Sequence, residues 1–318
     1  MEKRFSLSIS RYPFSVMFFG DYRVEIIPDT EFRLDGGAMF GVVPRVVWEH
    51  VSPPDESNRI QLNMNCLFIE TQREKILVET GIGEKWTEKQ TRAYGIFRTK
   101  SFAETLFEKT GYRREDISMV VNTHLHFDHA GGNTIWEDET ESRKLSPAQN
   151  GQNFKDRSTK TANRFSVPQF PNARYFVSES EFEHAENPHE RDRASYLAEN
   201  WRPLRESGQL ELKPDVYEIV EGLRIENVRG HSETMQTVYL KRGGETLYGF
   251  ADLIPTRHHL ALPWIMGYDL YPTETLEFKK RILPKAVKEN WICLFYHDFE
   301  TPLCRLAEIE GKIKAVEI

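Results

Sequence analysis

Cysteine is scarce in this sequence: Cys66, Cys293 and Cys304 are the only three among 318 residues, and none belongs to a CxxC pair. Because disulfide frameworks and zinc–thiolate sites use several closely spaced cysteines, both are excluded. Long apolar runs are also lacking, since charged residues and a proline interrupt the apolar residues between positions 11 and 21. We therefore expect neither a signal peptide nor a membrane span, and we predict a cytoplasmic protein.

Positive charge is scarce as well. The sequence has 42 Lys and Arg against 49 Asp and Glu, a formal net charge of −7, and no dense block of basic residues. A protein that follows a phosphate backbone needs such a block, so nucleic acid is not an expected partner. The hydrophobic fraction of 39% and the charged fraction of 29% are typical of a globular protein with a packed core.

Hairpins alternate with helices and single strands along the chain. Pairs of apolar segments separated by a polar turn predict hairpins at 62–70 with 75–79, 217–220 with 223–228, and 237–240 with 246–250. Single strands are predicted at 117–122, 173–177 and 291–296. Helices are predicted at 101–109, from 180, at 191–200, at 273–290 with a bend at Pro284, and at 302–309. This order predicts an α+β fold of two packed sheets with helices outside, a four-layered αββα sandwich formed by residues 1–318 as a single domain.

Residues 137–170 interrupt this pattern. Glu, Ser, Lys, Asn and Gln dominate the segment, and it has no apolar periodicity. We interpret it as a long polar surface loop inserted into the domain. Two roles stay open for such a loop: a tolerated insertion, or a lid over the histidine cluster that precedes it.

That cluster is the strongest local motif, the segment 124–129 with the sequence His-Leu-His-Phe-Asp-His. It directly follows the strand-like residues 119–122. Imidazole nitrogens and carboxylate oxygens suit zinc and neighbouring first-row metals, and a turn that leaves a strand can direct several side chains into one volume. Structural zinc sites are usually closed by four Cys or His ligands. The mixture of His124, His126 and His129 with Asp128 therefore predicts an open, water-bearing metal site.

Three further candidate ligands, His231, Asp252 and His297, lie in comparable places. Each of them follows an apolar strand-like segment. Polar side chains at the same end of several strands can meet at one edge of a sheet, where functional residues commonly lie. The sequence therefore predicts one shared metal site from segments about 170 positions apart.

In this order, the seven residues make the sequence resemble the metallo-β-lactamase superfamily from about Phe32 onward. The segments 35–41 (Asp-Gly-Gly-Ala-Met-Phe-Gly), 170–173 and 255–259 are similar to the branch that contains quorum-quenching lactonases and methyl-parathion-type hydrolases. The resemblance implies the αββα metallo-β-lactamase fold. It also implies a homodimer, since lactonases of this branch are commonly dimers.

The resemblance further implies which ligands share an ion: His124, His126 and His231 for one, Asp128, His129 and His297 for the other, with Asp252 bridging. The implied cofactors are two Zn²⁺ ions, or Mn, Fe or Co. A bridging hydroxide would be the nucleophile, because coordination lowers the pKa of water from 15.7 to about 7. Asp128 and Asp252 are thus catalytic candidates as well as ligands. Glu79, where the family often has aspartate, is expected to lie behind the ligands.

One position departs from the lactonase pattern. Many lactonases of this branch have a tyrosine three positions after the bridging aspartate, and this chain has Pro255, which cannot donate a hydrogen bond. His258, His259 and Tyr268 are the candidates to assist the substrate oxygen in its place. For the two histidines, a solvated pair or a structural hydrogen bond is the alternative interpretation.

An apolar substrate pocket is also predicted, because soft and aromatic side chains accommodate varied alkyl chains. The candidate lining residues are Met39, Phe40, Phe127, Trp264, Ile265, Met266 and Tyr268. Core packing is the alternative role for the apolar residues among them.

The resulting function is hydrolysis of a lactone or related ester, of the acyl-homoserine-lactone type, with this small molecule as the expected partner. The alternatives are a phosphotriesterase, an iron-dependent oxidoreductase and a catalytically silent binding protein. His126 stands where diiron relatives have glutamate, and His297 is a ligand that mononuclear relatives lack, so iron chemistry is disfavoured. The complete ligand set argues against a silent protein, and the acidic balance argues against RNA processing.

Overall fold

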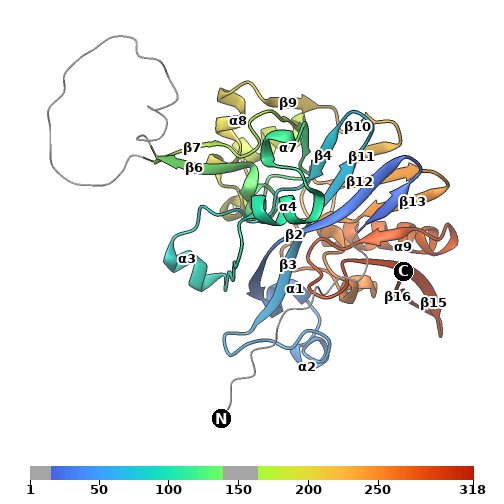
Figure 1. Cartoon of the computed structure of the whole chain (residues 1–318). Helices are drawn as coiled ribbons and strands as arrows, with labels where there is room; N and C mark the ends of the chain where they lie inside the picture. The colour runs from blue at the N-terminus through green and yellow to red at the C-terminus, as the bar shows by residue number, and fades with distance from the viewer. Residues whose placement is uncertain (1–15, 139–163) are drawn as a thin grey trace, which may run out of the picture.

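The computed structural model describes residues 16–138 and 164–318, which form two large mixed sheets with helices on their outer faces (Figure 1). The first sheet has the strand order β1-β2-β3-β4-β5-β8-β9. Its strands are β1 (Met17–Phe19), β2 (Tyr22–Asp35), β3 (Arg59–Glu70), β4 (Lys75–Val78), β5 (Met119–Val121), β8 (Arg174–Ser178) and β9 (Leu210–Lys213). The strands from β1 to β4 pair antiparallel, and those from β4 to β9 pair parallel. The first predicted hairpin is confirmed as β3–β4.

The second sheet runs from β10 to β16 in sequence order. Its strands are β10 (Val216–Val220), β11 (Leu223–Asn227), β12 (Gln236–Arg242), β13 (Glu245–Gly249), β14 (Ile292–Leu294), β15 (Leu303–Ile309) and β16 (Lys312–Val316). All neighbours pair antiparallel except β13 and β14, which are parallel. The two predicted hairpins at 217–228 and 237–250 are therefore confirmed.

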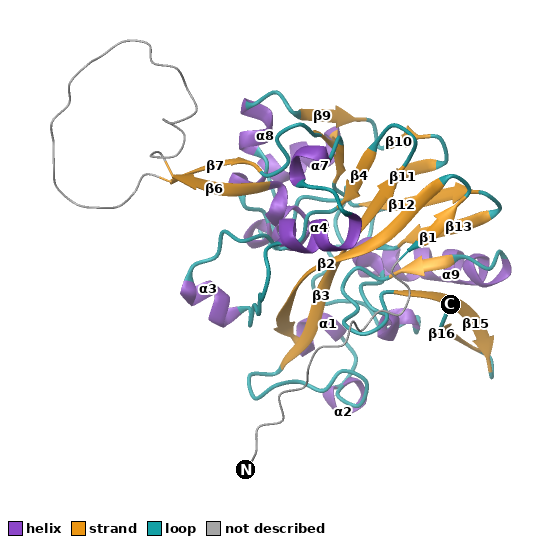
Figure 2. Cartoon of the chain, viewed as in Figure 1, coloured by secondary structure: helices purple, strands orange, loops and turns teal. Residues whose placement is uncertain are grey.

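The helices lie outside these sheets (Figure 2). They are α1 (Gly36–Phe40), α2 (Arg45–Trp48), α3 (Glu88–Ala93), α4 (Phe102–Thr110), α5 (Phe127–Ala130), α7 (Glu179–Glu186), α8 (Arg202–Glu206) and α9 (Pro272–Lys288). Helix α4 begins with the predicted capping box of Ser101 and Glu104 and ends at the left-handed Gly111. Helix α4 packs on β2, and α9 packs on β15. No helix in the described part of the chain combines the length and apolar content that a membrane span requires.

Two predicted helices are wrong. Residues 302–309 form β15 instead, where Cys304 and Leu306 are buried and their neighbours are less so. This alternation has the period of a strand, and it outweighs the helix-start signal of Pro302. Residues 191–200 contain two short 3-10 turns, η3 (Arg193–Ser195) and η4 (Ala198–Asn200). Between them Tyr196 pairs with His126 in an isolated bridge, so a tertiary contact interrupts the helix.

The predicted loop at 137–170 is structured at both ends. β6 (Thr134–Asp138) and β7 (Arg164–Pro168) pair antiparallel as a separate two-stranded ribbon that projects from the body (Figure 1). Residues 139–163 lie outside the described residues, as do residues 1–15. The choice between insertion and lid therefore stays open, and the single-domain interpretation of residues 1–318 stays a prediction.

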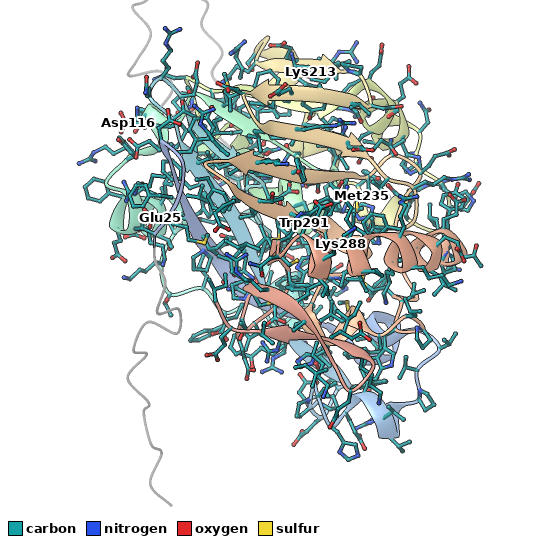
Figure 3. The ribbon with its side chains drawn as sticks, turned by 90° about the vertical axis from the view of Figure 1, so that its right-hand side faces the viewer. Glu25, Asp116, Lys213, Met235, Lys288 and Trp291 are labelled. Atoms are coloured by element: carbon teal, nitrogen blue, oxygen red, sulfur yellow. The ribbon has the colours of Figure 1, made fainter. Side chains whose placement is uncertain are left out.

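One buried cluster joins the two sheets. It contains Ile27 and Leu67 from the first sheet and Leu240 and Leu294 from the second, all fully buried. A second cluster lies between the second sheet and α9 and includes Phe278 of α9 and the labelled Met235 and Trp291 (Figure 3). Apolar burial on both faces of the second sheet accounts for the predicted layers, so the αββα sandwich is confirmed.

Candidate metal centre

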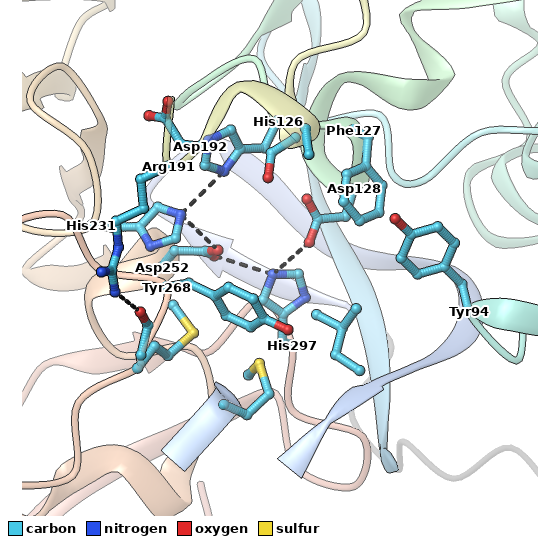
Figure 4. A pocket seen from close by; sticks show the side chains of 16 residues that line it. Tyr94, His126, Phe127, Asp128, Arg191, Asp192, His231, Asp252, Tyr268 and His297 are labelled. Carbon is cyan, nitrogen blue, oxygen red and sulfur yellow. Dashed lines mark hydrogen bonds and ion pairs between the residues drawn. The ribbon is translucent and has the colours of Figure 1, made fainter. Parts of the chain in front are cut away.

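The loops that follow four strands bring the predicted ligands together (Figure 4). The loop after β5 carries four of them, and α5 begins within it, at Phe127. His231 follows β11, Asp252 lies in the 3-10 turn η5 (Ala251–Leu253) after β13, and His297 follows β14. All seven residues are buried. The site thus lies where strand ends of both sheets meet.

The seven side chains form two groups of close ligand atoms. One is His124, His126 and His231, and the other is Asp128, His129, Asp252 and His297; within each group the ligand atoms lie within 4.8 Å of one another. His126 Nδ1 is 3.1 Å from His231 Nε2. His129 Nε2 is 3.1 Å from His297 Nε2 and 3.0 Å from Asp252 Oδ1. This is the division that the resemblance implies.

Asp252 connects the two groups through its two carboxylate oxygens. Oδ1 faces His129 and also lies 3.1 Å from His297 Nε2, whereas Oδ2 lies 3.5 Å from His231 Nε2. Each oxygen therefore points to a different group. A carboxylate in this position can bridge two cations.

The donor set fits two divalent first-row cations. Ligand nitrogens about 2.0–2.1 Å from a tetrahedral zinc ion lie about 3.3 Å from each other, close to the two spacings of 3.1 Å between imidazole nitrogens seen here. His124 Nε2 is buried and has no hydrogen-bond partner. A buried polar atom without a partner costs about 1–3 kcal/mol, and a metal ion would remove that cost.

The imidazole nitrogens that face away from the ligand groups are held in place. His124 Nδ1 is 3.0 Å from Thr123 Oγ1, His231 Nδ1 is 3.0 Å from Asp269 Oδ1, and His297 Nδ1 is 3.0 Å from the Asn63 carbonyl oxygen. His129 Nδ1 is 3.3 Å from Glu79 Oε1, which also accepts hydrogen bonds from the Thr123 hydroxyl and backbone N–H. Glu79 thus lies behind the ligands, as expected. These contacts fix the orientation of the four rings of His124, His129, His231 and His297 toward the site.

Burial and neighbouring charge act in opposite directions on the metal-free site. Burial and the neighbouring imidazoles lower the pKa of His124 and His126 well below 6.5, so both are neutral and able to bind metal. Burial also disfavours charge on His129, but the carboxylates of Asp252 and Glu79 outweigh it and raise the pKa of His129 well above 6.5. In the metal-free site, a proton on His129 balances the charge of these carboxylates, and bound cations would take over that role.

A cavity of about 400 Å³ opens onto these groups. Of the predicted substrate residues, Met39, Phe127, Met266 and Tyr268 line it, and Figure 4 labels Phe127 and Tyr268. Gly41 allows the segment that carries Met39 to approach the segment that carries Met266. Its φ is +55°, and a Cβ there would lie 2.4 Å from the Ile265 carbonyl oxygen. Small-molecule sites commonly have volumes of about 300–1,000 Å³.

Five predicted residues do not line this cavity, namely Phe40, His258, His259, Trp264 and Ile265. Both ring nitrogens of His259 are bonded, Nδ1 to Thr256 Oγ1 at 2.8 Å and Nε2 to the Met39 carbonyl oxygen at 2.9 Å. Phe40 stacks on His259 and contacts the ring of Trp264, so these aromatic side chains pack in the wall. His258 lies in a separate polar depression beside Arg257 and Asp298. The structure therefore supports a structural hydrogen-bonding role for His259 and a packing role for Phe40 and Trp264.

The cavity also has lining residues that the sequence did not indicate, including Leu34, Tyr94, Arg191 and Asp192. Tyr94 lies in the stretch between β4 and α4 that has no motif, and it reaches the cavity because its backbone carbonyl accepts a hydrogen bond from Arg33 N at 2.6 Å. Arg191 donates a hydrogen bond to the carbonyl oxygen of Gly267, which also lines the cavity. Only tertiary contacts identify these residues.

The fold and ligand set define a class of protein, and comparison with known families agrees. The chain belongs to the metallo-beta-lactamase superfamily, whose family model matches residues 60–282. An N-acyl homoserine lactonase of Bacillus cereus is 26% identical to it over 255 residues, which cover 76% of this chain and 84% of the lactonase.

Solved structures show the same fold. A probable metal-dependent hydrolase from Staphylococcus aureus superposes with a TM-score of 0.79 and 26% identity, covering 95% of this chain and 98% of that one. AidC, described as a dizinc quorum-quenching lactonase, superposes with a TM-score of 0.72 over 96% of this chain and 97% of its own. At 18% identity, the similarity to AidC shows the fold alone.

Proposed function

We propose that this protein is a dinuclear metal-dependent hydrolase that opens lactones or closely related esters. The observation that carries the proposal is the convergence of two ligand groups on one carboxylate, Asp252, at the floor of a cavity of small-molecule size. The similarity to N-acyl homoserine lactonases supports a lactone as the substrate.

The residues of this chain divide the work by position. His124, His126 and His231 would hold one ion, Asp128, His129 and His297 the other, with Asp252 between them. Two bound cations supply an activated water and a Lewis acid for acyl transfer. Met39, Phe127 and Met266 present apolar surface to an acyl group and exclude water from it.

Tyr268 is the one predicted substrate-binding residue with a hydroxyl group that lines the cavity. Its side chain lines the cavity near His297 (Figure 4), and burial together with the charges of Asp35 and Asp128 raises its pKa to about 12. The phenol therefore stays protonated at neutral pH and can donate a hydrogen bond. It contributes to the polar side of the substrate site, where Pro255 cannot.

Side-by-side rates on two substrate classes test this function. Purified protein reconstituted with zinc is assayed on N-acyl homoserine lactones of different chain length and on aryl phosphotriesters. We expect kcat/KM for the best lactone to exceed that for the phosphotriesters by at least tenfold. Negligible lactone turnover by protein that contains two metal ions would reject the proposal.

We further propose that the physiological ions are zinc and that the protein is a homodimer. The candidate ligand atoms are imidazole nitrogens and carboxylate oxygens, which suit zinc, and AidC is described as a dizinc lactonase. Metal analysis of protein purified without added metal tests the first point, with two zinc per chain expected. Light scattering coupled to size exclusion tests the second, and a monomer mass of 37.2 kDa would contradict it.

A further inference from the structure

Tyr94 occupies a position in the cavity that the proposed function leaves without a role. It follows helix α3, in the excursion between β4 and α4, and its side chain lines the cavity wall. Its hydroxyl points toward Asp128 from the side opposite His231 (Figure 4). Within residues 16–138 and 164–318, this hydroxyl has no hydrogen-bond partner. A polar group that faces a ligand carboxylate and is not used by the fold is available to a substrate.

The ring of Tyr94 is held on two sides. It contacts Trp86 edge-on, with ring centroids 5.3 Å apart, and it packs against Phe127 at 5.2 Å. Phe127 directly precedes the ligand Asp128 in the sequence. The orientation of the phenol is therefore coupled by packing to the loop that carries four of the seven ligands.

The backbone on either side of the ring is fixed as well. Tyr94 N donates to the Gln90 carbonyl at 2.8 Å, and the Tyr94 carbonyl accepts from Arg33 N. Arg59 Nη1 donates to the carbonyl oxygens of Arg92 and Ala93 at 2.8 and 2.7 Å. The excursion is thus tied to β2 and β3, and the hydroxyl is preorganised, which is what a donor to developing charge requires.

Two other polar side chains of the cavity, Arg191 and Tyr268, differ from Tyr94 in hydrogen bonding or exposure. The Arg191 guanidinium donates to the Gly267 carbonyl and lies on the side of His231 (Figure 4). Tyr268 also lines the cavity and is more exposed, at 39% of its surface. Burial and, secondly, the negative charge of Asp128 raise the pKa of Tyr94.

On the basis of the proposed function, we propose that Tyr94 is a catalytic hydrogen-bond donor. Its hydroxyl binds the substrate oxygen that gains negative charge beside Asp128. In the hydrolysis product, the same hydroxyl binds the new carboxylate.

Tyr94→Phe tests this role, because it removes one oxygen atom and keeps the ring that packs on Trp86 and Phe127. Removal of one donor to a developing oxyanion typically lowers kcat about 10²- to 10³-fold. We expect kcat on the preferred lactone to fall by roughly 100-fold with a smaller change in KM. Zinc content and melting temperature should equal those of the wild type. Tyr239→Phe, remote from the cavity, controls for the loss of a hydroxyl and should leave kcat unchanged.

A second measurement does not depend on turnover. The ring-opened product, an N-acyl homoserine, is titrated by calorimetry into zinc-loaded wild type and Tyr94→Phe. Loss of a hydrogen bond to a charged oxygen should weaken binding about tenfold or more. Tyr94→Phe with wild-type kcat and wild-type product affinity would overturn the proposal, especially if Tyr268→Phe carried the loss instead. Absence of lactone turnover in the wild type would reject the proposed function, and product binding would still test Tyr94.

Discussion

Asp269→Asn tests how helix α9 supports the metal site. Asp269 is 2% exposed, its Oδ1 lies 3.0 Å from His231 Nδ1, and its Oδ2 accepts a hydrogen bond from Thr275 of α9 at 2.7 Å. Asparagine has the same size and can replace both hydrogen bonds, but it removes the negative charge that makes the His231 imidazole a better ligand. Loss of such a partner typically lowers metal affinity about 10- to 100-fold, which is about 1.4–2.7 kcal/mol.

The effect should be confined to one of the two ions, because His231 belongs to the group with His124 and His126. Competition with a chromophoric chelator measures this directly. We expect one zinc equivalent to dissociate about 10 to 100 times more readily in Asp269→Asn and the other to dissociate as in the wild type. Thr275→Val is the matched control, since it removes one hydrogen bond and keeps the carboxylate, so its loss should be smaller. Unchanged affinity for both ions in Asp269→Asn would refute the reasoning.

Three further outcomes are expected. His126→Ala and Asp252→Asn should lower both zinc content and kcat, and full zinc occupancy in both variants would contradict the ligand assignment. Gly83→Ala should destabilise the fold more in urea titrations than Gly208→Ala. Both residues have positive φ, +70° and +75°, but only at Gly83 would a Cβ clash, 2.3 Å from the Gly131 carbonyl oxygen; the φ penalty alone is about 1–2 kcal/mol. The hydrogen bond that His184 Nε2 donates to the Asp192 carboxylate raises the pKa of His184 above 6.5, so this pair stabilises the fold below that pH and the contribution is lost as pH rises through the raised pKa. The stability difference between wild type and His184→Gln should therefore be larger at about pH 6 than at about pH 9, and a constant difference would exclude the ion pair.

The fold was largely predictable because hydrophobic periodicity is a local property. The three predicted hairpins and the capped helix α4 follow from alternation, turn residues and the Ser101–Glu104 box. The two helix errors have a shared physical origin. At 302–309 and 191–200, helix signals at single residues were outweighed by pairing partners elsewhere, β14 and β16 in one case and His126 in the other.

The candidate ligands could be found because metal chemistry restricts residue type and because each ligand follows a strand. His124, His231 and His297 can therefore be identified as candidate ligands from the sequence, and the structure brings them together. The cavity wall is different. Phe40 and Tyr268 are both aromatic residues that the sequence offers as candidates, yet only Tyr268 lines the cavity. Tyr94 also lines it, although it lies in a stretch that has no motif.

The sequence by itself determined the layered fold and the set of candidate metal ligands, since both depend on residue type and local spacing. The tertiary structure alone decided which side chains surround the cavity. It directed both nitrogens of His259 into hydrogen bonds within the wall, joined Arg191 to Gly267 by a hydrogen bond, and brought Tyr94 close to Asp128. The reason is that a cavity wall is assembled from loops whose positions depend on long-range packing and backbone hydrogen bonds, and these leave no periodic signal in the chain.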